Sequence, residues 1–166
     1  TTLNDVQKKW AERLNPGERK GSLTEALRGA DVFVGVSAAG ALQPEMIAGM
    51  NEKPIVFAMA NPMPEIMPDQ AKKAGVAVIG TGRSDYPNQI NNLLAFPGVF
   101  RGTLNCRASE INQAMKMAAV EALAGLISKE ELHADMILPS VFDERVVIAV
   151  AAAVKRMAIQ TGVAHG

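Results

Sequence analysis

The chain has 166 residues, in which 17 Lys and Arg balance 17 Asp and Glu, so its formal net charge is zero. This balance argues against a protein that binds nucleic acid or a membrane surface through bulk charge. Apolar residues make up 48% and aromatic residues only 4% of the chain, which predicts one globular domain with an aliphatic core. Since no stretch has the pattern of a signal peptide or a spanning helix, we expect a cytoplasmic protein.

Two helices are predicted before the first strand. Apolar residues recur at helical spacing from Leu3 to Leu14, which indicates an amphipathic helix that ends at Asn15-Pro16-Gly17. Ser22 and Glu25 have the spacing of a capping box, so a short second helix is expected there. Because this pattern begins almost at once and residue 1 is not Met, we expect a piece of a longer polypeptide.

Three short apolar runs follow, at residues 32–36, 55–59 and 76–79. Such runs are typical of strands that are buried on both faces of a parallel sheet. Short helices are predicted between them, from Pro44 to Met50 and from Asp69 to Ala74. The alternation of strands and helices predicts an α/β fold.

The last third of the chain is helical in pattern. One apolar stripe runs from Ile111 to Leu126 and another from Val146 to Ala158, which predicts two long helices. Ser128 and Glu131 repeat the capping-box spacing in the connector between them.

Small and polar residues follow each predicted strand, and this is where an open α/β sheet binds ligands. They are Ser37-Ala38-Ala39-Gly40, Asn61-Pro62 and Gly80-Thr81-Gly82. Pro62 disfavours the helical region for Asn61, and the Asn61 amide suits a ribose hydroxyl or a carboxylate because it both donates and accepts. The alternative is that Asn-Pro merely begins a turn.

Neither a complete phosphate-binding motif nor a catalytic cluster stands out in the sequence. Gly80 and Gly82 begin a dinucleotide fingerprint, but Asp85 occupies the place of its third glycine, so close backbone approach is the simpler role. Residues 85–92 carry three Asn and one Gln, whose amides need a ligand or internal partners unless they form a plain polar loop. Neither His has metal-ligand spacing, and Cys106, the single cysteine, is expected to be a small buried residue.

Several stretches closely resemble the cofactor domain of prokaryotic malic enzymes. They are GADVFVGVSAAG (29–40), FAMANPMPEI (57–66) and GTGRSDYPNQINNLLAFPGVFRG (80–102), followed by the helix from Ile111 to Ile127 and the ILPSVFDERV segment. The resemblance covers nearly everything after Ser22, and the match over residues 80–102 is highly specific.

The resemblance implies a Rossmann-like, doubly wound parallel sheet, incomplete on its N-terminal side, in which residues 1–166 form one partial NAD(P)-binding domain. Malic enzymes oxidise malate with NAD or NADP and decarboxylate the product to pyruvate with a divalent metal, Mg or Mn. By the same resemblance Ser37, Ala38, Asn61 and Asn91 bind the cofactor. The resemblance also implies that malate is bound by Asn61, Asn91 and Asn92.

The chain departs from the family pattern in two ways. Ala39 stands where the family commonly has proline. The family's catalytic Tyr and Lys, its acidic metal ligands and its Gly-rich turn all lie upstream of the matched region. We therefore expect no catalytic residue in this chain, metal ligands mainly outside it, no activity from it alone, and a homo-oligomer. A non-catalytic nucleotide- or partner-binding module, another dehydrogenase and a malolactic-type decarboxylase remain as alternatives.

Overall fold

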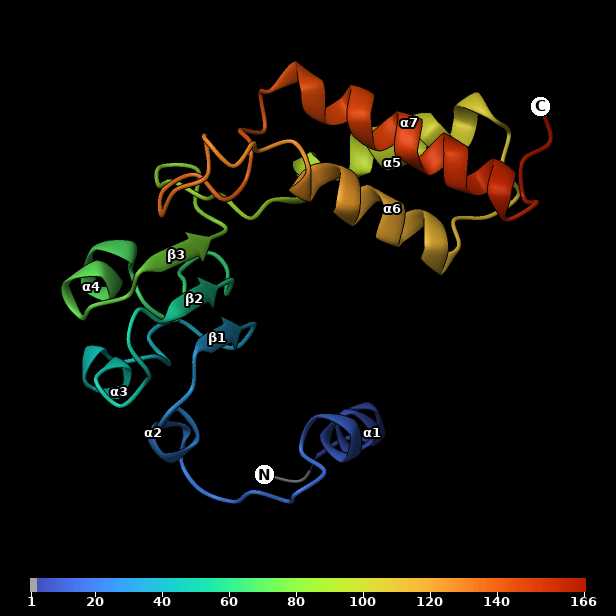
Figure 1. Ribbon diagram of the computed structural model, residues 1–166. Helices are drawn as coiled ribbons and strands as arrows, with labels where there is room; N and C mark the ends of the chain where they lie inside the picture. The colour runs from blue at the N-terminus through green and yellow to red at the C-terminus, as the bar shows by residue number, and fades with distance from the viewer. Residues whose placement is uncertain (1–2) are drawn as a thin grey trace.

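The computed structural model describes residues 3–166, which form a small parallel sheet followed by a group of longer helices (Figure 1). The order of elements agrees with the predicted alternation of strands and helices and with the two long helices after it. In chain order the elements are α1 (Asp5–Leu14), α2 (Leu23–Ala26), β1 (Val32–Gly35), α3 (Pro44–Ile47), β2 (Ile55–Ala58), α4 (Pro68–Lys73), β3 (Val78–Thr81), the 3-10 helix η1 (Asn92–Leu94), α5 (Phe96–Asn105), α6 (Gln113–Ala124) and α7 (Glu144–Gln160).

The sheet has the strand order β1-β2-β3, and both pairs are parallel. Phe33, Val56 and Ile79 are aligned neighbours on the three strands. They pack in one cluster with Ile47 of α3 and Ala71 of α4, the helices that lie beside the sheet in Figure 1. This cluster is the first of two hydrophobic cores: Leu27, Phe33, Leu42, Ile47, Val56, Ala58, Ile66, Ala71, Val76 and Ile79. The parallel register brings the carboxyl ends of all three strands to one edge.

The opposite face of β1 is open. Val32, Val34 and Val36 are 47%, 59% and 79% exposed, whereas Phe33 between them is buried. The prediction that this strand is covered on both faces is therefore wrong within residues 3–166. Alternation is the physical reason, since successive side chains point to opposite faces and the described residues pack one layer of helices on the sheet.

Helices α5, α6 and α7 pack side by side as a second unit (Figure 1). Their contact carries the second core, which includes Leu94, Cys106, Met115, Ala119, Val146, Val150, Val154 and Ala158. Helix α5 was not predicted. Pro97 lies in its first turn, where the missing N–H leaves no bond unmade.

Two glycines, one helical turn apart on α5, allow its close contact with α7. A Cβ atom added at Gly98 would lie 2.6 Å from Val150 Cβ, and one added at Gly102 would lie 2.6 Å from the Ala151 carbonyl oxygen. Cys106 follows at the end of α5, fully buried, and its thiol donates a hydrogen bond of 3.3 Å to the Gly102 carbonyl oxygen. The prediction that Cys106 is a small buried residue is confirmed.

The predicted first helix is confirmed, and none of its residues is buried. Asn4 and Gln7 exchange hydrogen bonds of 2.8 and 3.0 Å between side chain and backbone, which caps the helix N-terminus. Its apolar residues Val6, Trp10 and Leu14 are 67%, 51% and 76% exposed. Helix α1 thus presents an apolar stripe that no other part of residues 3–166 covers.

Some boundaries differ from the prediction by a few residues. Strand β3 begins at Val78 rather than Val76, since the Ala77 N–H bonds the Pro54 carbonyl oxygen before the strand starts. Ser128 and Glu131 form both capping-box bonds, yet only a turn follows them. Within residues 3–166 no helix has the length and apolar character needed to cross a bilayer.

Candidate functional site

The loops after β1 and β2 lie against each other at the carboxyl edge of the sheet. The Gly40 N–H donates to the Pro64 carbonyl oxygen at 3.2 Å, and the Leu42 N–H donates to the Glu65 carbonyl oxygen at 3.1 Å. The small residues of the first loop, Ser37 and Ala38 among them, are exposed. The fold thus brings two predicted segments together, the one at Ser37 and the one at Asn61.

A buried carboxylate joins these two loops. Glu65 is 0% exposed. Its Oε1 atom accepts hydrogen bonds from the Ser37 N–H at 2.6 Å and from the Ser37 hydroxyl at 3.0 Å. Its Oε2 atom accepts one from the Ala60 N–H at 3.0 Å. Glu65 therefore holds the residue that begins the first loop and the residue directly before Asn61.

Gly35 makes room for this carboxylate. A Cβ atom at position 35 would lie 2.6 Å from both Cδ and Oε1 of Glu65, so any side chain there would displace the carboxylate. Sequence reasoning missed Glu65. The signal was a single acid between Pro64 and Ile66, two residues that are themselves buried.

Burial raises the pKa of the Glu65 carboxyl, but the hydrogen bonds from the backbone N–H groups of Ser37 and Ala60 and from the Ser37 hydroxyl outweigh it. The pKa therefore lies below the ordinary value of 4.5. A carboxylate that accepts backbone N–H bonds is stabilised in its charged form. Glu65 is ionised at neutral pH.

This lowered pKa predicts a pH dependence of stability. A group whose pKa falls on folding stabilises the protein above its unfolded pKa, and that contribution is lost as the pH falls through the folded pKa. We expect the difference in free energy of unfolding between the wild-type chain and Glu65→Gln to be constant from neutral pH to about pH 5 and to shrink below the ordinary carboxyl pKa of 4.5. Urea unfolding of both proteins across this range measures it. A difference that grows as the pH falls would contradict the assignment.

Asn61 is exposed at the end of the second loop, and its peptide bond to Pro62 is cis. Its side-chain NH2 group makes one long hydrogen bond of 3.4 Å to the Met59 carbonyl oxygen. A Cβ atom at Gly82 would lie 3.0 Å from the Asn61 Oδ1 atom, so the glycine after β3 leaves room for this amide. Close approach of this kind is the role that the sequence predicted for Gly82.

Comparison with known proteins identifies the family of this chain. The family described as "Malic enzyme, NAD binding domain" matches residues 1–159. The chain belongs to the malic enzyme family. The predicted resemblance is confirmed, and so is the Rossmann-like NAD(P)-binding fold that it implied.

Relatives and solved structures agree with this assignment. The chain is 57% identical over 163 residues to the bifunctional malic/malolactic enzyme of Bacillus subtilis and 53% identical over 165 residues to the NAD-dependent malic enzyme of Geobacillus stearothermophilus. These alignments cover 98% and 99% of this chain but only 40% and 34% of the relatives. The crystal structure of the NAD-dependent malic enzyme of Thermotoga maritima matches with a TM-score of 0.87 at 46% identity, over 93% of this chain and 40% of that one.

The carboxyl edge of this malic enzyme domain presents small side chains and neutral polar groups. The first loop ends at Gly40, where a Cβ atom would meet nothing within 4 Å. This loop and the exposed Asn61 amide offer small side chains, backbone groups and one neutral polar group. Within residues 3–166, no three His, Cys, Asp or Glu side chains gather as a metal site would require.

Asn91 and Asn92 lie at the start of η1. The Asn91 Oδ1 atom accepts a hydrogen bond of 2.9 Å from the Leu93 N–H and so caps this short helix, while Asn92 is exposed. No hydrogen bond found in residues 3–166 joins either amide to Ser37 or Asn61. The contacts of Asn91 and Asn92 with ligands stay predictions.

One amide of the same segment is satisfied internally. Asn88 is buried, and its NH2 group donates to the carbonyl oxygens of Ile79 and Ala134 at 3.0 and 2.8 Å. Its Oδ1 atom accepts from the Ile137 N–H at 2.9 Å. Asn88 thus ties strand β3 to the connector before α7.

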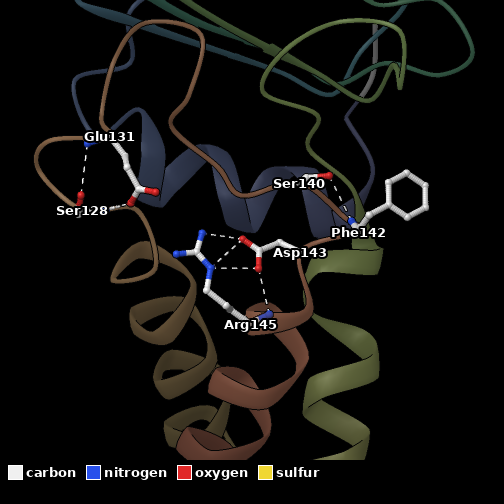
Figure 2. A network of polar contacts seen from close by, with 6 residues as sticks. All are labelled: Ser128, Glu131, Ser140, Phe142, Asp143 and Arg145. Atoms are coloured by element: carbon white, nitrogen blue, oxygen red, sulfur yellow. Dashed lines mark hydrogen bonds and ion pairs between the residues drawn. The ribbon is translucent and has the colours of Figure 1, made fainter.

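Figure 2 shows this connector, with its polar contacts, as it enters α7. Asp143 accepts from the Arg145 backbone N–H at 2.9 Å and pairs with the Arg145 guanidinium at 2.7 Å, hydrogen bonds that hold the pKa of Asp143 below its ordinary value. Phe142 points away from this network and is 90% exposed. With Tyr86 and Leu93 it lines a cavity of about 380 Å³ between the connector and the segment after β3.

Proposed function

We propose that the carboxyl edge of the sheet binds the nicotinamide end of NAD or NADP. Ser37, Ala38, Asn61 and Asn91 contact the cofactor, and Asn61, Asn91 and Asn92 contact malate. The observation that carries this proposal is the pairing of the Ser37 and Asn61 loops through Glu65 at the carboxyl ends of adjacent strands. This edge is where open α/β sheets bind dinucleotides.

The whole protein to which this domain belongs would oxidise malate and decarboxylate the product to pyruvate and CO2. Bound NAD(P) supplies the hydride acceptor in this reaction. The residues of this chain hold the cofactor and malate in the orientation that hydride transfer requires. The catalytic groups come from outside these 166 residues, and so do most of the Mg or Mn ligands. The domain by itself is inactive, and the protein works as a homo-oligomer. The exposed apolar residues of β1 and α1 are consistent with further chain packing there.

Binding of reduced cofactor to the full-length protein that carries this domain tests the proposal, because the Gly-rich turn is expected upstream of these residues. We expect NADH or NADPH to shift the backbone amide resonances of Ser37, Ala38 and Asn61 in two-dimensional NMR spectra. Asn61→Ala should weaken binding about three- to tenfold, because one hydrogen bond contributes about 1 kcal/mol. Asn105→Ala, an exposed asparagine at the end of α5, is the matched control and should leave the affinity unchanged. Shifts confined to the α5–α7 unit, or none from either nucleotide, would refute the assignment.

A malolactic reaction is the second candidate, and the name of the Bacillus subtilis relative favours it. It would use the same cofactor edge but release lactate instead of pyruvate, with no net reduction of NAD. Product analysis of the full-length protein with malate and NAD separates the two reactions. Lactate without NADH supports the malolactic reaction, whereas pyruvate with stoichiometric NADH supports oxidative decarboxylation.

A further inference from the structure

The hydrogen bonds of Glu65 connect the two loops that carry the proposed cofactor contacts. Oε1 holds the Ser37 N–H and hydroxyl, and Oε2 holds the Ala60 N–H, one residue before Asn61. The two oxygens of a carboxylate lie at a fixed separation. Glu65 therefore sets how far apart the Ser37 and Asn61 loops stand.

We propose that Glu65 is the positioning residue of the cofactor site, which fixes the Ser37 and Asn61 loops at the spacing that the nicotinamide end of the dinucleotide requires. The inference rests on the proposed function, since it assigns Glu65 a role in the same site. Glu65 acts through Ser37 and Ala60 and does not itself touch the ligand, because it is fully buried.

The cost of burying this charge supports a role beyond packing. Taking a carboxylate out of water is unfavourable unless it is fully hydrogen-bonded, and apolar residues of similar volume usually stabilise a fold at least as well. Here Gly35 is left without a side chain to admit the carboxylate. Gly35 and Glu65 are thus both needed to place this buried carboxylate at the proposed ligand-binding edge.

Glu65 also determines what Ser37 can bind. The ionised carboxylate accepts only, so the Ser37 hydroxyl hydrogen points inward to Oε1, and its free lone pairs are left to accept from a ligand. The group that meets the Ser37 oxygen must then be a donor. A ribose hydroxyl or a carboxamide NH2 of the cofactor satisfies this requirement, whereas a phosphate or carboxylate oxygen does not.

Glu65→Gln is the test, with Glu25→Gln as a matched control. Glu25 makes nearly the same bonds as Glu65, since it accepts from the Ser22 N–H at 2.7 Å and from the Ser22 hydroxyl at 2.9 Å, but it is exposed at the start of α2. The affinity of each variant for NADH and NADPH is measured by NMR titration at a temperature where all variants are fully folded. Thermal unfolding is recorded in parallel.

We expect Glu65→Gln to weaken NAD(P)H binding about tenfold or more, because a small misplacement of binding groups is costly. Glu25→Gln should bind as the wild type does. Glu65→Asp keeps the charge and should recover part of the affinity lost in Glu65→Gln. If Glu65→Gln does not fold, Glu65→Asp is compared with the wild type and should still bind more weakly, since its shorter side chain cannot reach both loops.

The outcomes separate the two proposals. If the wild type binds and Glu65→Gln binds equally well while only its melting temperature falls, Glu65 is structural and the inference is overturned. If the wild type gives no shifts at Ser37 and Asn61 with either nucleotide, the proposed cofactor site itself fails, and the role of Glu65 fails with it. Wild-type binding at this edge with selective loss in Glu65→Gln supports both.

Discussion

Gly102→Ala lowers the free energy of unfolding by about 1–3 kcal/mol, although alanine is the better helix former by about 1 kcal/mol. The added methyl group would lie 2.6 Å from the Ala151 carbonyl oxygen and 2.9 Å from Val154 Cβ. These atoms belong to α7 and cannot rotate away as the end of a flexible side chain can. Helices α5 and α7 must therefore separate, which opens gaps in the second core. Urea unfolding measures the loss.

Gly49→Ala is the matched control for this prediction. A Cβ atom at Gly49 would meet the Met46 carbonyl oxygen at 3.5 Å and Arg28 Cγ at 3.6 Å, which is ordinary van der Waals contact. We expect no loss of stability from Gly49→Ala. Alanine restricts the unfolded chain more than glycine does, which favours a gain of about 0.4–1 kcal/mol. Equal stabilities of the two variants would show that α5 and α7 are not in close contact at Gly102.

Asn88→Ala should lower the free energy of unfolding by about 2–3 kcal/mol, since a buried group left without a partner costs about 1–3 kcal/mol and a partly exposed group costs less. The substitution leaves three groups without this partner: the buried carbonyl oxygen of Ile79, and the carbonyl oxygen of Ala134 and the N–H of Ile137, whose bonds are only partly buried. Alanine is also strained at this position, where φ is +55°. Thermal and urea unfolding report the effect.

Asn88→Gly separates the two causes. Glycine accepts the positive φ but makes none of the three hydrogen bonds, so it should retain most of the loss. If Asn88→Gly is as stable as the wild type, the amide bonds contribute nothing and backbone strain explains Asn88→Ala. Asn91→Ala, which removes a single local bond to the Leu93 N–H, should cost about 1 kcal/mol or less.

Local patterns were enough to predict most elements of this fold. Apolar runs located the three strands to within two residues, and apolar stripes located α1, α6 and α7. Helix α5 was missed, because the reason for Gly98 and Gly102 is their contact with α7, about 50 residues away in the sequence. The open face of β1 was also unpredictable, since the apolar run at residues 32–36 does not say how many layers of helices will cover the strand.

Some residues of the candidate site could likewise be predicted from the sequence, and others could not. Asn61 and Ser37 could be found because residues after parallel strands gather at one edge of a sheet. Glu65 could not, since its importance comes from donors at positions 37 and 60 that converge only after folding. Asn88 and Asn91 look alike in sequence, yet one is buried with three partners and the other caps a short helix.

The position of Cys106 gives the helical unit a thiol of its own. It is the single cysteine of the chain, it is fully buried against α5, and the sheet unit has none. A thiol reagent can reach it only when the helices, or the C-terminal residues packed on them, move away, so the rate of its modification reports opening of the α5–α7 unit and not fraying of β1 or α1. The chain thus carries a built-in probe that distinguishes motion in the helices from motion at the ligand-binding edge.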